Sequence, residues 1–224
     1  MDCVVQTGSI CGVTSTANLT PKGEATRERI VVKAADLMWA RGVGATSLDD
    51  IRAGTATSKS QLFHYFPGGK SELISAIVTF QGERVLDAQR PYLDSLDTWD
   101  AWEGWRHAIL AHYGSQVHWG CPISALAREL IGLDEERATE SKKYMDRWRG
   151  YLYDGLLRMR EAGTLKPFAS PESLSLSTFA SLHGGLLLSQ TMQSIRPLQS
   201  ALDGALELLH SAAATSREGR DRGR

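Results

Sequence analysis

Apolar residues recur with a period close to 3.6 along most of the chain, the spacing that places side chains on one face of an α-helix. The first such stretch runs from Thr26 to Arg41, and Gly42 follows it as a residue suited to ending a helix. The same period predicts longer helices at residues 70–90, 98–118, 122–133, 135–162, 171–192 and 197–213. Alternating apolar and polar runs bounded by turn residues are missing from the sequence, so we expect an all-α fold.

Two short helices with capping signals lie between the first helix and the longer ones. Ser47 and Asp50 have the spacing of a capping box, and Ser58 and Gln61 repeat it. The break at 54–57 predicts a tight turn between these helices. Two short helices joined by a tight turn are typical of a helix-turn-helix, whose second helix enters the major groove of DNA.

The start of the second short helix carries small or flexible polar side chains. Lys59 can donate to guanine O6 and N7, Gln61 can pair with adenine through two hydrogen bonds, and Ser60 leaves room for the helix to enter the groove. Polar groups at nearby helix ends suit phosphate contacts, which fix the register. The predicted DNA-binding residues are Thr46, Ser47, Ser58, Lys59, Ser60, Gln61, His64, Tyr65 and Lys70. Leu62, Phe63 and Phe66 are predicted to be core residues.

This part of the chain resembles the TetR/AcrR family of transcriptional regulators. The resemblance is carried by Thr26–Ile30, Ala34-Ala35, Gly42, Thr46–Leu48, Ile51, Ser58-Lys59, Leu62–Lys70 and Glu72-Leu73. It implies a three-helix helix-turn-helix domain followed by a helical domain for ligand binding and dimerisation. It also implies that Lys59, Ser60 and Gln61 face bases and that a homodimer binds a double-stranded DNA operator. Release by a small-molecule effector, and hence a repressor, would follow from the same resemblance.

Three features depart from the family pattern. Thr55, Ala56 and Thr57 stand where Ala-Gly-Val is usual, and Ala accepts a positive φ less readily than Gly, so we expect strain in the turn. Ser60 stands where Gly is common, and Phe63 stands where Tyr is common. These departures bear on the operator sequence more than on the fold. They leave open the alternative of a helical small-molecule-binding protein with weak or no DNA binding.

The patterns divide the chain into four parts. Residues 1–23 are rich in Ser, Thr and Gly and predict a flexible arm. Residues 24–75 predict the helix-turn-helix domain, and residues 76–215 predict the helical ligand-binding and dimerisation domain. Residues 216–224 are charged and predict a frayed tail.

Five of the six tryptophans lie between residues 99 and 148, within the long helices. Aromatic walls with a few polar groups are typical of a pocket for a small hydrophobic or aromatic molecule, although aromatic residues at helical spacing also form cores. The predicted ligand-binding residues are Trp102, Trp105, Tyr113, Trp148, Tyr151 and His183.

The last two helices are apolar on more than one side. Gly184 and Gly185 favour close approach of another helix, because each Gly in a helix interior costs about 1 kcal/mol and needs a compensating reason. Two helices from each of two subunits could bury these faces in a four-helix bundle, and the alternative is that they cover the core of their own subunit. The predicted dimer-interface residues are Phe179, Leu182, Gly184, Leu186, Leu202 and Leu206.

Charge and cysteine content narrow the function classes. The net charge is −1, so any DNA contact must come from a local basic surface, and Lys and Arg slightly outnumber Asp and Glu between Pro21 and Phe80. The chain has three cysteines, Cys3, Cys11 and Cys121, and no CxxC spacing. This argues against a disulfide framework or a structural zinc site and predicts a protein of the reducing cytoplasm. Cys121 opens a helix whose dipole could lower its thiol pKa for redox sensing, and an inert buried thiol is the preferred alternative.

Other function classes lack support in the sequence. No basic segment followed by an apolar run resembles a secretion signal, and no apolar run is long enough to span a membrane. Histidine spacing does not suit a metal site, and no catalytic constellation or Gly-rich phosphate loop is present. We therefore expect neither an enzyme nor a cofactor or metal.

Overall fold

The computed structural model describes residues 19–116 and 120–214. Within these ranges the chain forms nine α-helices, one 3-10 helix and no strand, which confirms the predicted all-α fold. The α-helices are α1 (Pro21–Arg41), α2 (Leu48–Thr55), α3 (Lys59–Tyr65), α4 (Gly69–Asp87), α5 (Trp99–Gly114), α6 (Pro122–Leu130), α7 (Glu135–Glu161), α8 (Pro171–Met192) and α9 (Arg196–Ser211). The 3-10 helix, η1, is Tyr92–Asp94.

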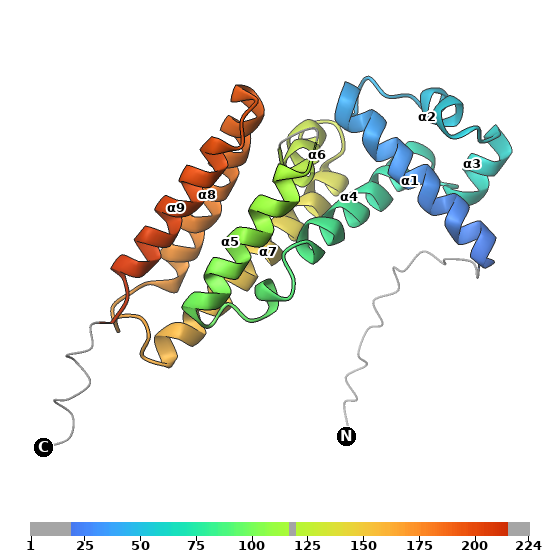
Figure 1. Ribbon diagram of the computed structural model, residues 1–224. Helices are drawn as coiled ribbons and strands as arrows, with labels where there is room; N and C mark the ends of the chain where they lie inside the picture. The colour runs from blue at the N-terminus through green and yellow to red at the C-terminus, as the bar shows by residue number, and fades with distance from the viewer. Residues whose placement is uncertain (1–18, 117–119, 215–224) are drawn as a thin grey trace, which may run out of the picture.

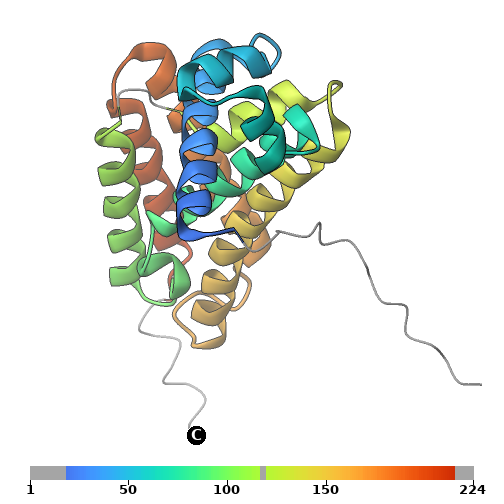
Figure 2. The ribbon, with the colours of Figure 1, turned by 90° about the vertical axis from the view of Figure 1, so that its right-hand side faces the viewer.

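The helices form a small head and a larger body. The head consists of α1, α2 and α3 at one end of the molecule, and α8 and α9 lie side by side at the opposite end of the body (Figure 1). Helix α4 runs from the head into the body, where it packs against α6 and α7. With the head turned toward the viewer, α1 to α3 lie in front of the body helices (Figure 2).

Two clusters of buried apolar side chains match this division. The first joins α1, α2, α3 and the beginning of α4 to Leu126 and Leu130 of α6. The second joins the end of α4 to η1, α5, α7, α8 and α9. The change from one cluster to the other falls on α4 between Val78 and Val85, so α4 belongs to both units.

The head begins with a capped helix start. Thr20 Oγ1 accepts a hydrogen bond from Gly23 N, and Pro21 occupies the first turn, where its missing N–H removes no helical hydrogen bond. Residues 21–23 are therefore helical, and the prediction that the flexible arm reaches residue 23 is wrong for them. The predicted arm over residues 1–18 and the predicted tail at 216–224 lie outside the described residues.

Helices α8 and α9 approach each other closely at Gly185. A Cβ atom at residue 185 would lie 2.8 Å from Ala201 Cβ and 3.0 Å from Leu198 Cα, so any side chain there would force the helices apart. The close approach predicted from the glycine pair therefore occurs within the subunit at Gly185. Gly184 points to solvent instead.

Candidate nucleic-acid interface and ligand groove

Reciprocal caps hold the two short helices of the head. Ser47 Oγ accepts from Asp50 N at 3.1 Å, and Asp50 Oδ2 accepts from Ser47 N at 2.9 Å. Ser58 Oγ accepts from Gln61 N at 3.1 Å, and Gln61 Oε1 accepts from Ser58 N at 3.1 Å. Both predicted capping boxes are confirmed. The hydrogen bonds from Ser47 also hold the pKa of Asp50 below its ordinary value.

The turn between α2 and α3 closes around an alanine in a left-handed conformation. Ala56 has φ 50° and ψ 40°, a region that costs an L-residue about 1–2 kcal/mol. Neighbouring hydrogen bonds impose it: Thr57 N donates to the Arg52 carbonyl at 3.1 Å, and the Arg29 guanidinium donates to the Thr55 carbonyl. The strain expected from Ala at this position is therefore present in the folded turn.

Helix α3 buries one side and exposes the other. Leu62 and Phe66 are buried in the head. Lys59, Ser60 and Gln61 are exposed together in the first turn of the helix. Because Gln61 Oε1 is engaged by the Ser58 N–H, the amide Nε2 is the atom of Gln61 that is left to donate outward.

The flanking residues differ in how accessible they are. Ser47, Ser58 and His64 are exposed, whereas Tyr65 and Lys70 are half-buried. The Lys70 ammonium donates to the Val43 carbonyl at 2.7 Å, which ties the start of α4 to the turn between α1 and α2.

Two predictions about the head are wrong. Thr46 is fully buried, and its hydroxyl donates to the Gly42 carbonyl at 2.8 Å, so it closes the turn after α1 instead of facing a phosphate. Phe63, which we expected in the core, is 40% exposed. It lies one helical turn after Lys59 and therefore on the same face.

The aromatic residues predicted to line a ligand pocket form the core of the body instead. Trp102, Trp105, Tyr113 and Trp148 have no exposed surface. Gln89, which no sequence pattern singles out, is buried among them, and its Oε1 accepts from Trp105 Nε1 at 2.7 Å and from Trp148 Nε1 at 2.8 Å. A lone Gln at the end of an amphipathic helix gives no signal that distinguishes it from a surface residue.

The two other predicted ligand residues, Tyr151 and His183, lie beside polar side chains of other elements. The Tyr151 hydroxyl lies 3.5 Å from the Arg90 guanidinium on the outer side of the body. His183 Nδ1 lies 3.3 Å from Ser124 Oγ, and its ring packs edge-on against Trp148. Burial lowers the pKa of His183 to about 4, so the ring is neutral at pH 7.

The redox hypothesis for Cys121 loses its physical basis. Cys121 precedes α6, as expected, but it is only 6% exposed. Burial raises the pKa of its thiol, which is the opposite of the shift a redox sensor requires. The inert buried thiol is the interpretation that the structure supports.

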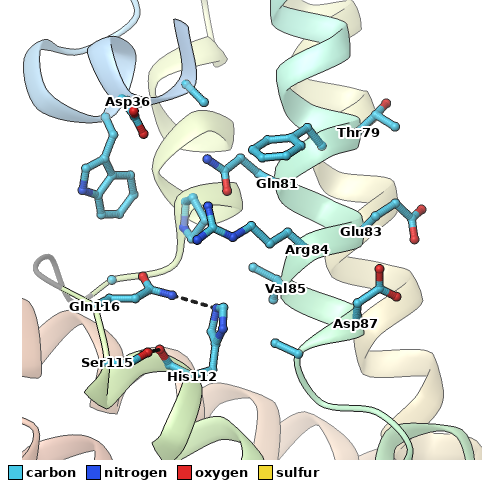
Figure 3. Close-up of a pocket in the computed structure, with 16 residues that line it drawn as sticks. Asp36, Thr79, Gln81, Glu83, Arg84, Val85, Asp87, His112, Ser115 and Gln116 are labelled. Carbon is cyan, nitrogen blue, oxygen red and sulfur yellow. Dashed lines mark hydrogen bonds between the residues drawn. The ribbon is translucent and has the colours of Figure 1, made fainter. Parts of the chain in front are cut away.

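An open groove of about 920 Å³ lies between the head and the body. Its described lining residues are Ala35, Asp36 and Trp39 of α1, Thr79, Phe80, Gln81, Glu83, Arg84, Val85, Asp87 and the adjoining Ala88 of α4, His112 of α5 with the following Ser115 and Gln116, and Gly120 and Pro122 at the start of α6. None of the six predicted ligand-binding residues is among them. Arg84, Gln81 and Gln116 reach into the space between the helices (Figure 3).

The predicted interface residues are mostly used within the subunit. Phe179, Leu182, Leu186, Leu202 and Leu206 are buried in the body core, which fits the alternative that these faces cover the core of their own subunit. Gly184 is exposed. The large apolar side chains that remain exposed on α8 and α9 are Leu176, Leu187, Leu188, Met192 and Leu208.

The described residues lack two features that would point to other function classes. None of their helices is long and apolar enough to cross a membrane. No group of three or more His, Cys, Asp or Glu side chains in this part of the chain is arranged to hold a metal ion.

The capped α2–turn–α3 unit on a helical body defines a helix-turn-helix protein of the DNA-binding class. Residues 30–77 match the family model described as "Bacterial regulatory proteins, tetR family". Residues 103–203 match the model "Transcriptional regulator LmrA/YxaF-like, C-terminal domain". The chain belongs to the TetR family of DNA-binding transcriptional regulators, which are not enzymes.

Curated relatives and solved structures agree with this assignment. The HTH-type regulator YxaF of Bacillus subtilis is 29% identical over 80% of this chain and 92% of its own. An uncharacterized HTH-type regulator of Mycobacterium tuberculosis is 28% identical over 77% of this chain and 88% of its own. A TetR regulator from Chloroflexus aurantiacus has the same fold, with a TM-score of 0.77 at 22% identity over 87% of this chain and 98% of its own.

Proposed function

We propose that this protein is a dimeric repressor that reads a near-palindromic operator with α3 and leaves it when a small molecule binds. The observation that carries the DNA-binding part is the exposed polar face of α3. The capping boxes at the starts of α2 and α3 fix both helices of the motif. Lys59 supplies a cation for guanine O6 and N7, and Gln61 supplies its free amide donor to a base edge. Ser60 is small enough to let the helix enter the major groove.

Phe63 joins this reading surface. An exposed aromatic ring one turn after Lys59 is costly in water and suits an apolar contact, such as one with the methyl group of thymine. Ser47, Ser58, His64, Tyr65 and Lys70 surround the reading residues and serve as phosphate contacts in this proposal. Thr46 is left out because its side chain is buried.

The homodimer is proposed from a continuous apolar stripe on α8. Residues 176, 180, 184, 188 and 192 are exposed Leu, Ala, Gly, Leu and Met at a spacing of four, which aligns them along one face of the helix. Leu208 of α9 is a further exposed apolar side chain. In this proposal the same face of a second copy covers the stripe in a four-helix bundle. Reading two half-sites requires the two copies of α3 to lie one DNA turn apart, about 34 Å.

The proposal is tested by selecting DNA from a random pool with the purified protein. We expect an enriched sequence with two inverted half-sites whose centres are about 10 base pairs apart. A pool that keeps random composition at moderate salt would support the alternative, a helical small-molecule-binding protein without sequence-specific DNA binding. A single unpaired half-site would contradict the dimer while leaving the reading role of α3 in place.

A further inference from the structure

The groove between head and body is walled by both units. Helix α1 of the head forms one side, the C-terminal half of α4 forms the opposite side, and the end of α5 and the start of α6 close it below. Its volume of about 920 Å³ falls within the usual range of sites for small organic molecules, about 300–1,000 Å³. A molecule in this groove would touch the head and the body at the same time.

Arg84 gives the groove a positive centre. Its guanidinium points into the groove (Figure 3), and among the described residues it forms no ion pair. His112 is neutral at pH 7, because burial and the charge of Arg84 lower its pKa. Arg84 is therefore the one cation among the described residues that line the groove at neutral pH.

The acidic residues of the α4 wall are engaged elsewhere. Glu83 accepts from the Arg147 guanidinium at 2.7 Å, and Asp87 is paired with Arg90. Both carboxylates point away from the groove (Figure 3). Asp36 lies on α1, on the opposite wall. The α4 side of the groove therefore attracts a negative group.

Apolar and neutral polar groups complete the lining. Trp39 and Phe80 are half-buried, which leaves part of each ring open. Trp39 lies beside Gly120, where a Cβ atom would approach the indole ring to 3.2 Å. Gln116 and His112 hold each other through a 2.8 Å hydrogen bond at the α5 end. A flat apolar body next to Trp39, with an acidic group directed at Arg84, fits these neighbours.

We infer that this groove is the effector site and that it takes a small organic anion with a flat aromatic body. The inference rests on the proposed function, because it locates the effector of the proposed repressor. It replaces the aromatic cluster around Trp102 and Trp148, which is closed by packing.

The position of the groove also couples binding to DNA release. Helix α6 begins at Pro122 in the groove and ends near Glu129, whose carboxylate accepts from Val43 N in the turn after α1. Helix α4 carries Arg84 in the groove and Lys70 on the Val43 carbonyl. Both helices therefore connect the groove to the turn that positions α2 and α3. A ligand that prefers one spacing of α1 and α4 shifts the population of DNA-binding conformers.

The test measures ligand binding and DNA binding separately on the full chain. Benzoate, 2-naphthoate and anthracene-2-carboxylate, each with its uncharged primary amide, are titrated calorimetrically into the wild type, Arg84→Gln and Arg128→Gln. Arg128 is an exposed arginine of α6 that does not line the groove and serves as the matched control. Anisotropy of a labelled operator duplex is then recorded with and without each compound.

We expect at least one carboxylate to bind the wild type and Arg128→Gln equally and to bind Arg84→Gln at least tenfold more weakly. The amides should bind wild type and Arg84→Gln within about twofold, because they lack the charge that Arg84 recognises. The bound carboxylate should weaken operator affinity at least tenfold. No carboxylate binding at millimolar concentration, or equal loss in Arg128→Gln, overturns the site. Failure of the ligand-free protein to bind any operator refutes the proposed function instead.

Discussion

We expect the buried side chain of Gln89 to stabilise the core of the body. It is 1% exposed, and its side-chain oxygen accepts from the indole N–H groups of both Trp105 and Trp148. Its amide nitrogen donates to the Val85 carbonyl at 2.7 Å. One side chain therefore satisfies two buried donors that come from α5 and α7. We consider the substitution Gln89→Leu, which keeps the size of the side chain and removes its polar atoms.

The cost follows from the two indole groups that lose their acceptor. A buried donor left without a partner costs about 1–3 kcal/mol, so the pair predicts a loss of about 2–6 kcal/mol in the free energy of unfolding. For a chain of this size, that corresponds to a fall in melting temperature of roughly 5–20 °C. The backbone of α4 keeps its helical hydrogen bonds, so the effect should come from the indoles.

Urea unfolding followed by tryptophan emission measures this difference. Gln199→Leu is the matched control, because Gln199 is exposed on α9 and the same change there should stay within about 0.5 kcal/mol of the wild type. A Gln89→Leu protein as stable as the Gln199→Leu control would refute the reasoning. It would mean that the two indoles find other partners in the core.

Three further predictions concern the turn, a buried histidine and the apolar stripe. Ala56→Gly should raise the free energy of unfolding by about 0.5–1 kcal/mol in urea, since Gly adopts the positive φ of 50° without strain, and no gain would argue against strain there. Burial lowers the pKa of His183 to about 4, so between that value and the ordinary one near 6.5 the unfolded chain binds more protons, and stability falls as pH falls through this window. His183→Gln should remove that part of the pH dependence between pH 7.5 and 5, and equal slopes in the two proteins would contradict the assignment. Leu188→Glu on the apolar stripe of α8 should yield a monomer in light scattering at micromolar concentration, whereas Lys142→Glu on α7 should not, and a Leu188→Glu dimer would exclude this face.

Helical periodicity and capping signals were enough to predict most of the fold. The Ser47 and Ser58 capping boxes are local hydrogen-bond patterns, so the sequence states them directly. The predicted start of α1 is too late, although Thr20 and Pro21, a cap and a first-turn proline, mark the true start in the sequence. That error could have been avoided from the sequence alone.

The candidate sites were harder to predict, because burial depends on partners far along the chain. Thr46, expected at the surface, is buried, and Phe63, expected in the core, is exposed. Periodicity shows that an aromatic stripe is buried but not whether space remains beside it, so it does not distinguish Trp102 and Trp148 as core residues from the same residues as pocket walls. The groove joins residues from α1, α4 and α5, and no local pattern links Trp39 to Arg84 or His112.

The central claim is that α3 reads DNA sequence, and the affinity of the Lys59→Ala protein for the selected operator tests it most directly. Anisotropy titrations would compare wild type, Lys59→Ala and Lys142→Ala on that operator and on a duplex of scrambled sequence, at one salt concentration. The account predicts that Lys59→Ala lowers operator affinity about tenfold or more and reduces the ratio of operator affinity to scrambled-duplex affinity. Lys142→Ala should change neither quantity. Equal binding of wild type and Lys59→Ala to the operator, or no preference of the wild type for it, would contradict the account.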